Sequence, residues 1–262
     1  MANGNGGMMT FGEHLEVFRS MLLRIIAIIA VFGAVIFCCK DITFSILFAP
    51  NSSEFITYRI IEDVCRWLGI AVTFEPYSIQ MINTELSSQF MTHLSTSVYL
   101  ALLLASPFIL AEALRFITPA LYENERKYSA RITITIFALF ATGILMSYFV
   151  IFPFSIRFLG TYQVSSEVVN MINLSSYIST FTTLTFLMGI VFQIPVISFF
   201  LAKMGILSAV FMARYRRHAL ILILIIAAVI TPPDMFTQIL VTMPMYALYE
   251  VSILIVKRIT NN

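Results

Sequence analysis

The sequence predicts an all-α integral membrane protein, a single domain whose six transmembrane helices leave both termini in the cytoplasm. Hydrophobic residues make up 59% of its 262 residues and charged residues only 11%, whereas about 25% of the residues in a typical soluble domain are charged. Lipid must therefore cover much of the surface. Six apolar runs read as membrane spans, and we predict spans at residues 21–39, 91–114, 132–152, 178–202, 218–233 and 235–256.

The distribution of basic residues predicts the orientation. When six spans are threaded with the N-terminus in the cytoplasm, the cytoplasmic segments hold 12 of the 16 lysines and arginines and the external segments hold four. Cytoplasmic loops of membrane proteins carry such an excess of basic residues. Because an odd number of spans would scatter this bias, the number of spans and the orientation support each other.

Residues 41–90 form a long connection that we expect to act as an external cap. Pro50 should end or turn the chain after the first span. Between residues 58 and 68, apolar residues recur at helical spacing with charged residues between them, namely Ile60, Ile61, Val64, Trp67 and Leu68. The pattern predicts an amphipathic helix that lies on the membrane or on the protein. A packed surface loop is the alternative.

The fifth apolar run is short. Residues 218–233 number 16, which is about 24 Å of helix, whereas the hydrocarbon core is about 30 Å thick. The last two helices, joined by the TPPD turn, should stop short of the outer face or thin the bilayer around them. A helix that is short only for packing reasons is the alternative.

The residue inventory disfavours several classes of site. A formal net charge of +2 is too small to suggest nucleic-acid binding. Cys38 and Cys39 are neighbours inside an apolar run and Cys65 stands alone, so no disulfide framework is expected. The three histidines are far apart in sequence, and no P-loop is present. We therefore expect no metal and no cofactor, and any energy source is external to the chain.

Two other functions were weighed from the same residues. A secondary transporter of a small solute would also have six spans with buried polar groups, but paired half-repeats or broken helices are expected there and the sequence shows neither. An intramembrane hydrolase needs a nucleophile near a base. His93 lies near the outer edge of the second predicted span, and no Ser-x-Gly elbow accompanies it. We expect the protein not to be an enzyme, with the transporter as the alternative function.

Five short motifs occur in order along the chain: HLEVFR at residues 14–19, FITPALYENERK at 116–127, YFVIFP at 148–153, FQIPV at 192–196, and TPPD at 231–234 with Gln238 after it. This series resembles the TatC family, the signal-peptide receptor subunit of the twin-arginine protein translocase. The family's motifs are HLxELR, F(I/V)xPALYxxERR, YFxxFP, FExPV and TPPD, and the resemblance runs from residue 11 to about 258.

The resemblance implies a glove-shaped, six-helix protein of the bacterial inner membrane that binds twin-arginine signal peptides at its cytoplasmic face. It further implies self-association, assembly with single-span partners of the TatA and TatB types, and export of folded proteins driven by the proton-motive force. No nucleic acid is implied as a partner.

A planar guanidinium forms two parallel hydrogen bonds with one carboxylate, so acids are the expected receptors for a pair of arginines. In the predicted topology, the cytoplasmic segments hold four acids, which lie in the two segments that resemble the receptor site. Glu125 is the first candidate and Glu16 the second. The full predicted signal-peptide site is Glu125, Glu16, Phe116, Glu112, Glu123, Leu121 and Tyr122. The alternative is that Glu125 pairs with Lys127 or Arg131 at a solvated surface.

The chain departs from the family pattern at two acidic positions. Val17 occupies the place of the usual acid in HLxELR, and Glu16 stands one residue earlier, which rotates the carboxylate by about 100° on a helix. Glu123 stands where relatives often carry a base, and a second acid there strengthens the attraction for a dibasic peptide.

A second group of predicted residues is partner-facing or structural: Gln193, Thr231, Asp234, Gln238, Pro50 and Arg19. Gln193 replaces a frequent glutamate about 15 Å inside the fourth span. Because an amide does not titrate, a proton relay through this position is excluded. It either hydrogen-bonds a partner or holds helices together. Asp234 either caps the last helix or forms, with Thr231 and Gln238, a polar patch for a partner helix. Pro50 shapes the first external segment or only ends the first span.

Overall fold

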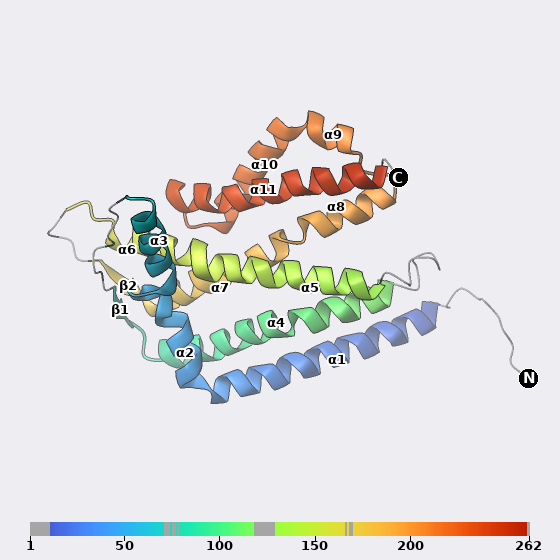
Figure 1. Ribbon diagram of the computed structural model, residues 1–262. Coiled ribbons are helices and arrows are strands. Elements are labelled where there is room, and N and C mark those ends of the chain that lie inside the picture. The colour runs from blue at the N-terminus through green and yellow to red at the C-terminus, as the bar shows by residue number, and fades with distance from the viewer. Residues whose placement is uncertain are drawn as a thin grey trace, which may run out of the picture. The chain divides into compact units, whose positions relative to one another are not determined.

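The computed structural model describes residues 11–70, 74, 77, 79–117, 129–165, 167 and 170–260 (Figure 1). In these ranges the chain is almost entirely helical, as predicted. The elements, in order, are α1 Phe11–Cys38, α2 Lys40–Phe48, the 3₁₀ turn η1 Ala49–Asn51, α3 Ile56–Trp67, β1 Gln80–Ile82, α4 Ser88–Ile117, α5 Ser129–Met146, the π-helical turn η4 Ser147–Ile151, α6 Phe152–Thr161, β2 Met171–Asn173, α7 Leu174–Val191, α8 Ile194–Lys203, α9 Ala209–Arg214, α10 Arg216–Ile230 and α11 Met235–Thr260.

Within the described residues, five helical segments are long and apolar enough to cross a membrane: Leu15–Cys38, Ser88–Leu110, Ile132–Thr161, Leu174–Lys203 and Met235–Thr260. They match five of the six predicted spans. The remaining prediction corresponds to α10, whose 15 residues give about 22 Å of helix. The expected shortness of this helix is confirmed, while a sixth crossing stays a prediction.

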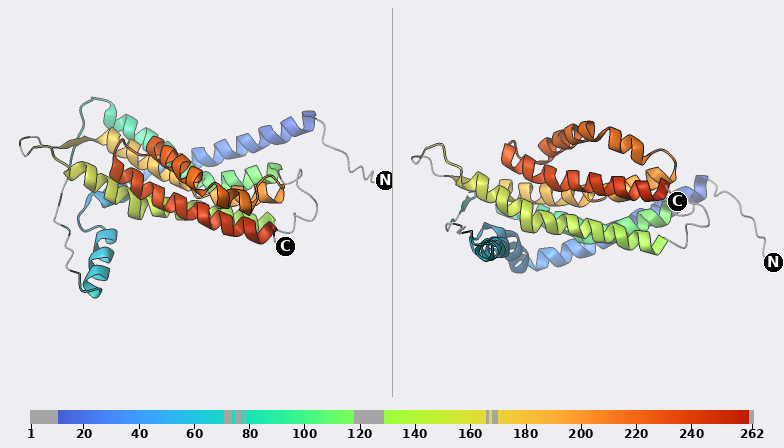
Figure 2. Two further views of the ribbon diagram at one scale, coloured as in Figure 1. Left: turned by 90° about the horizontal axis from the view of Figure 1, so that it is seen from above. Right: turned by 45° about the horizontal axis from the view of Figure 1, so that its top comes forward.

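The chain forms two compact units. The first comprises residues 1–38 and 97–137, and the second residues 39–96 and 138–262. In the second unit, α11 packs along α8 and against α10 and α9, and Figure 2 shows α11 running beside α8 and α10. That the whole chain is a single membrane domain stays a prediction.

The third and fourth predicted spans meet at glycines. A Cβ at Gly143 of α5 would lie 2.6 Å from the carbonyl oxygen of Met188 in α7, and one at Gly189 would lie 2.7 Å from the ring of Phe140. Small residues let membrane helices approach closely. The close approach therefore requires glycine at position 143, where the neighbouring atom belongs to the backbone.

Two prolines leave the carbonyl oxygen four residues before them without its helical N–H donor, and a side-chain hydroxyl donates to each of these oxygens instead. Pro50 has no N–H for the oxygen of Ile46, and the Tyr148 hydroxyl donates to that oxygen at 2.8 Å. Pro153 likewise releases the oxygen of Phe149, which accepts from Thr57. In a membrane protein such groups must find partners inside the protein. These bonds fasten α2 and α3 to η4, whose π-helical turn comes just before Pro153.

Aromatic rings surround Arg157 in the middle of α6. Its guanidinium carbon lies 5.1 Å from the Tyr58 ring centroid, 4.8 Å from that of Phe74 and 4.7 Å from that of Tyr77, within the range of cation–π attraction. Burial raises the pKa of both phenols, so the hydroxyls stay protonated at neutral pH. Tyr58 can thus donate to Pro153 O and Tyr77 to Pro50 O, at 2.8 and 3.0 Å. Pro50 is buried in η1, where its carbonyl anchors the cap.

A two-stranded parallel sheet was not predicted. Gln80, Met81 and Ile82 pair with Met171, Ile172 and Asn173. Three residues are too few to show a strand periodicity, and their partners are about ninety residues away, so no local pattern indicates the pairing. We call the end of the second unit that carries this sheet the sheet end.

The predicted amphipathic helix is confirmed as α3, and its apolar side is not packed against the protein. Ile56, Ile60, Val64 and Trp67 are all at least half exposed, and Trp67 is 85% exposed. In each view of Figures 1 and 2, α3 lies across the direction in which α7 and α11 run. An amphipathic helix perpendicular to the spans has the geometry of one that lies in the membrane interface.

We therefore expect Trp67, the one tryptophan of the chain, to contact lipid. In vesicles with brominated acyl chains its fluorescence should be strongly quenched, whereas aqueous iodide should quench it weakly. The Trp67→Phe variant, which has no tryptophan, gives the background fluorescence to subtract. Strong quenching by iodide with no effect of bromine would show that α3 stands in water.

Candidate functional site

The centre of the predicted signal-peptide site lies outside the described residues. Leu121, Tyr122, Glu123 and Glu125 fall in the segment 118–128, and their role stays a prediction. Phe116 belongs to α4, and the structure describes its backbone only. Helix α4, which leads into this segment, and α1, which belongs to the same unit, are described. Their contacts show which side chains lie near the start of the segment.

An ion pair joins α1 to α4 in the first unit. Arg24 Nη2 lies 3.2 Å from Glu112 Oε2, and the two side chains are 55% and 12% exposed. Glu112 was predicted to contact a signal peptide. In the structure its carboxylate is largely buried and engaged by Arg24, so its place is to hold the two helices rather than to present a free acid.

Further contacts fix the direction of the two helices. The rings of Phe32 and Phe108 lie 6.1 Å apart, and a Cβ at Gly33 would lie 3.7 Å from that of Ala101. As the residue number rises along α1, the partner's number falls along α4, so the helices are antiparallel. Residues that precede Arg24 thus lie at the same end as residues that follow Glu112.

This register brings the predicted acids of α1 to the end where α4 enters segment 118–128. Glu16 is two turns before Arg24, about 12 Å along the axis, and Phe116 is one turn after Glu112. Glu16 and Arg19 are exposed on α1, as are Leu15, Val17 and Phe18. On the described part of α1, an incoming peptide would therefore meet the carboxylate of Glu16, the guanidinium of Arg19 and exposed apolar side chains.

The Arg24–Glu112 pair provides a prediction. Glu112→Gln should lower the free energy of unfolding by about 1–2 kcal/mol, because it weakens a charge-assisted contact that is only partly exposed. The reversed pair, Arg24→Glu with Glu112→Arg, should recover most of the loss suffered by either reversal alone. Thermal unfolding in detergent measures both. Additive losses in the double variant would show that the two side chains do not interact.

Gln193 lies at a break in the fourth span. Helix α7 ends at Val191 and α8 begins at Ile194, with Pro195 in the first turn of α8. The proline has no N–H for the oxygen four residues before it, and the amides of Val196 and Ile197 both donate to the carbonyl of Gln193. The expectation that no helix is broken was therefore wrong, because one proline was too weak a signal.

Thr231, Asp234 and Gln238 lie at the turn of the α10–α11 hairpin, and the bond from Gln238 joins the two helices. Asp234 Oδ1 accepts from the backbone N–H of Thr237 at 2.6 Å, so the aspartate caps α11. Gln238 Nε2 donates to Leu224 O of α10 at 3.1 Å, and the Thr231 hydroxyl donates to Ala227 O at 2.9 Å. The second oxygen of Asp234, Oδ2, is buried with no hydrogen-bond partner among the described residues.

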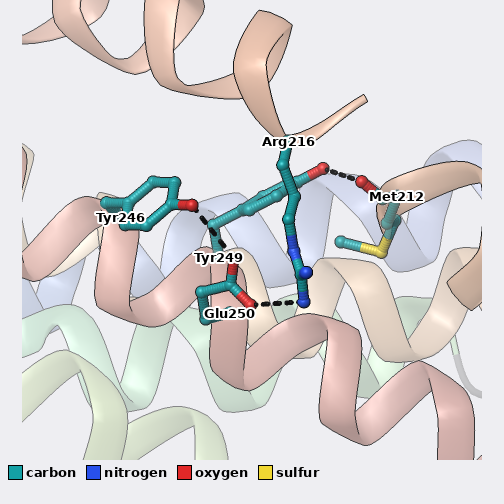
Figure 3. Close-up of polar contacts among 5 residues, drawn as sticks. All are labelled: Met212, Arg216, Tyr246, Tyr249 and Glu250. Carbon is teal, nitrogen blue, oxygen red and sulfur yellow. Dashed lines mark hydrogen bonds and ion pairs between the residues drawn. The ribbon is translucent and has the colours of Figure 1, made fainter. Parts of the chain in front are cut away.

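A polar cluster that sequence reasoning missed connects the other end of this hairpin (Figure 3). Arg216 Nη2 lies 2.9 Å from Glu250 Oε2, Tyr246 donates to Glu250 Oε1 at 3.1 Å, and Tyr249 donates to Met212 O at 2.9 Å. The available signal was Glu250 itself, a carboxylate inside an apolar span that needs a partner there. The cluster fixes the start of α10 and the end of α9 onto α11.

Within the described ranges, no group of three or more histidines, cysteines or acids comes together in a way that could hold a metal ion. Most of the polar side chains described above pair with one another or with backbone groups, whereas Glu16 and Arg19 are exposed and Asp234 Oδ2 has no hydrogen-bond partner among the described residues.

Residues 13–244 match the family described as Sec-independent protein translocase protein (TatC). Among curated proteins, the Sec-independent protein translocase protein TatC of Blattabacterium sp. subsp. Periplaneta americana is 35% identical over 251 residues, with 94% of each chain covered. That of Carboxydothermus hydrogenoformans is 33% identical over 252 residues, covering 95% of this chain and 93% of the relative.

A solved structure matches as well. The crystal structure of a twin-arginine translocase receptor, TatC, superposes with a TM-score of 0.73 at 26% sequence identity. The match covers 95% of this chain and all of that one.

Proposed function

Because this chain belongs to the TatC family of Sec-independent protein translocase proteins, we propose that it is the receptor subunit that binds twin-arginine signal peptides. It is a membrane-embedded component of a protein translocase rather than an enzyme. We further propose that it lies in the bacterial inner membrane with both termini in the cytoplasm. The excess of basic residues in the cytoplasmic segments supports that orientation.

One observation carries the proposal. The antiparallel pairing of α1 and α4, closed by Arg24 and Glu112 at 3.2 Å, brings exposed Glu16 to the end where α4 enters segment 118–128. We propose that two segments a hundred residues apart in sequence, which hold the four acids of the predicted cytoplasmic segments, approach one another there. A dibasic peptide requires such paired acids.

In this proposal Glu125 and Glu16 each hold one guanidinium, and Glu123 adds to the local negative charge. Phe116, Leu121 and Tyr122 provide the apolar surface for residues beside the arginines. Glu112 acts indirectly, because its ion pair with Arg24 holds α1 against α4. The charge on the acids steers the peptide, so binding weakens as ionic strength rises.

The partners are proposed from the second unit. Single-span proteins of the TatA and TatB types would dock near the α10–α11 hairpin, where the buried Oδ2 of Asp234 has no hydrogen-bond partner among the described residues and can accept a donor. Gln193 adds a polar group at the break of the fourth span. Self-association, and export of folded cargo driven by the proton-motive force, complete the proposed role.

Binding to the purified chain tests the receptor function. The protein in nanodiscs should bind a fluorescent twin-arginine peptide at least ten-fold more tightly than the same peptide with two lysines, since lysine lacks the bidentate fork of arginine. Fluorescence anisotropy gives both affinities. Equal affinities for the two peptides would contradict a receptor that reads arginine.

A further inference from the structure

A hollow of about 700 Å³ opens at the sheet end of the second unit. Its described walls come from α2, from β1 and the turn after it, from the first turns of α4, and from the first residue of α7. The polar lining side chains are Lys40, Asn83, Gln89 and His93, and aromatic rings such as Phe44 and Phe90 form much of the rest. Ligand pockets in proteins span about 300–1,000 Å³, so the hollow has room for a small-molecule group.

The charge of this lining has one sign. Lys40 lines the hollow, and no aspartate or glutamate does so among the described lining residues. The nearest acids along the chain, Asp41 and Glu85, are exposed and lie outside the lining. The Phe44 ring contacts the imidazole of His93, with centroids 5.7 Å apart, and Phe44 lies one turn after Lys40 on α2, so the aromatic wall adjoins the lysine. Such a lining favours an anion that carries an apolar part.

The hollow lies at the level where the spans begin. Gln89, Phe90 and His93 are in the first turns of the apolar segment that starts at Ser88, and the lining residue Leu174 is the first residue of the segment that ends at Lys203. Lys40 follows, by two residues, the apolar segment that ends at Cys38. Head-group phosphates occupy this level of a bilayer, next to the ends of the hydrocarbon core.

From these three observations we propose that the hollow binds the head group of an anionic glycerophospholipid. Lys40 takes the phosphate, the amides of Asn83 and Gln89 bind the glycerol hydroxyls, and the acyl chain leaves along Phe44 and Phe90. This site requires only that the chain is in a membrane, so it is independent of signal-peptide recognition. A bound lipid would fill the space between α2 and the start of α4 and so stabilise the cap.

Native mass spectrometry of the detergent-purified protein, titrated with phosphatidylglycerol or phosphatidylcholine, tests the proposal. We expect phosphatidylglycerol to bind about five-fold more tightly, which is the effect of one lysine beside an anionic lipid. Lys40→Gln should abolish this preference, and so should Gln89→Glu, which places a carboxylate in the hollow without a change of size. Lys257→Gln, which removes an exposed lysine of α11, should leave it intact.

Three results would overturn the proposal. The first is equal binding of the two lipids by the unmodified protein. The second is an equal loss of preference in the Lys40 and Lys257 variants, which would mean that overall charge is responsible. The third is displacement of the lipid by millimolar inorganic phosphate, which would show that the site takes a free anion. If Lys40→Gln is unstable, Gln89→Glu tests the same prediction. Its unfolding temperature shows whether that variant is folded.

Discussion

Replacing Glu125 with glutamine is expected to weaken binding of a twin-arginine peptide by about ten- to a hundred-fold, because a hydrogen bond to a charged group contributes about 1.5–3 kcal/mol. Glutamine keeps the size of the side chain and removes the charge, so the loss measures the carboxylate alone. The protein should insert and unfold as before, since the residue is proposed to contact the peptide rather than the fold. Fluorescence anisotropy with the protein in nanodiscs measures the affinity.

A matched control for this variant is Glu54→Gln. Glu54 is an exposed acid whose partner is Arg59, 2.9 Å away on α3, and it lies in the other unit. Its replacement should leave peptide affinity unchanged. If both variants bound equally well, Glu125 would not be a receptor for arginine, and a solvated pair with Lys127 or Arg131 would be the better interpretation.

The second large effect is expected at Gly143. Gly143→Ala should cost about 1–3 kcal/mol of stability, the range for overpacking a close-packed contact, because the added Cβ would lie 2.6 Å from Met188 O and 3.0 Å from Gly189 Cα. Both atoms belong to the backbone of α7, so no side chain can move aside. Thermal unfolding in detergent and the yield of folded protein both report the loss.

Two other glycines calibrate this result. Gly189→Ala should cost less, since its new Cβ meets the ring of Phe140, which can shift. Gly33→Ala should be neutral or stabilising, because its nearest neighbour is at 3.7 Å and alanine favours a helix by up to about 1 kcal/mol. An unfolding temperature of Gly143→Ala as high as that of Gly33→Ala would mean that α5 and α7 do not pack this closely.

The elements that depend on local composition were predictable. Long apolar runs predicted six spans, five of which have a matching helix among the described residues, and the spacing from Ile60 to Leu68 predicted α3. Hydrophobicity and helical periodicity are properties of neighbouring residues. Pro50 and the TPPD turn predicted chain reversals for the same reason. The shortness of α10 could be read from the number of residues between His218 and Pro233.

Features that depend on distant partners were not predictable. The pairing of Gln80–Ile82 with Met171–Asn173 and the occupation of the Phe149 carbonyl by Thr57 join segments about ninety residues apart. The break at Gln193 was also not predicted from Pro195, because many membrane helices tolerate a proline. In each case the deciding atoms belong to another element.

The candidate site divides in the same way. Asp234 was predicted from its residue type and position either to cap a helix or to form a polar patch, and the structure shows the cap. The role of Glu16 stays a prediction. The partner of Glu112 was missed because Arg24 lies on another helix. Glu250 was not predicted, although a carboxylate within an apolar run is itself a signal.

The most direct measurement is site-specific photocrosslinking to a signal peptide from position 124, next to Glu125, which leaves the Glu125 carboxylate in place. A photoreactive residue there should crosslink to a peptide that carries two arginines. The crosslink should fall to background when both arginines are replaced by lysine, and it should weaken when Glu16 is changed to glutamine. Equal crosslinking to both peptides, or none to either while the protein is inserted and folded, would contradict the account.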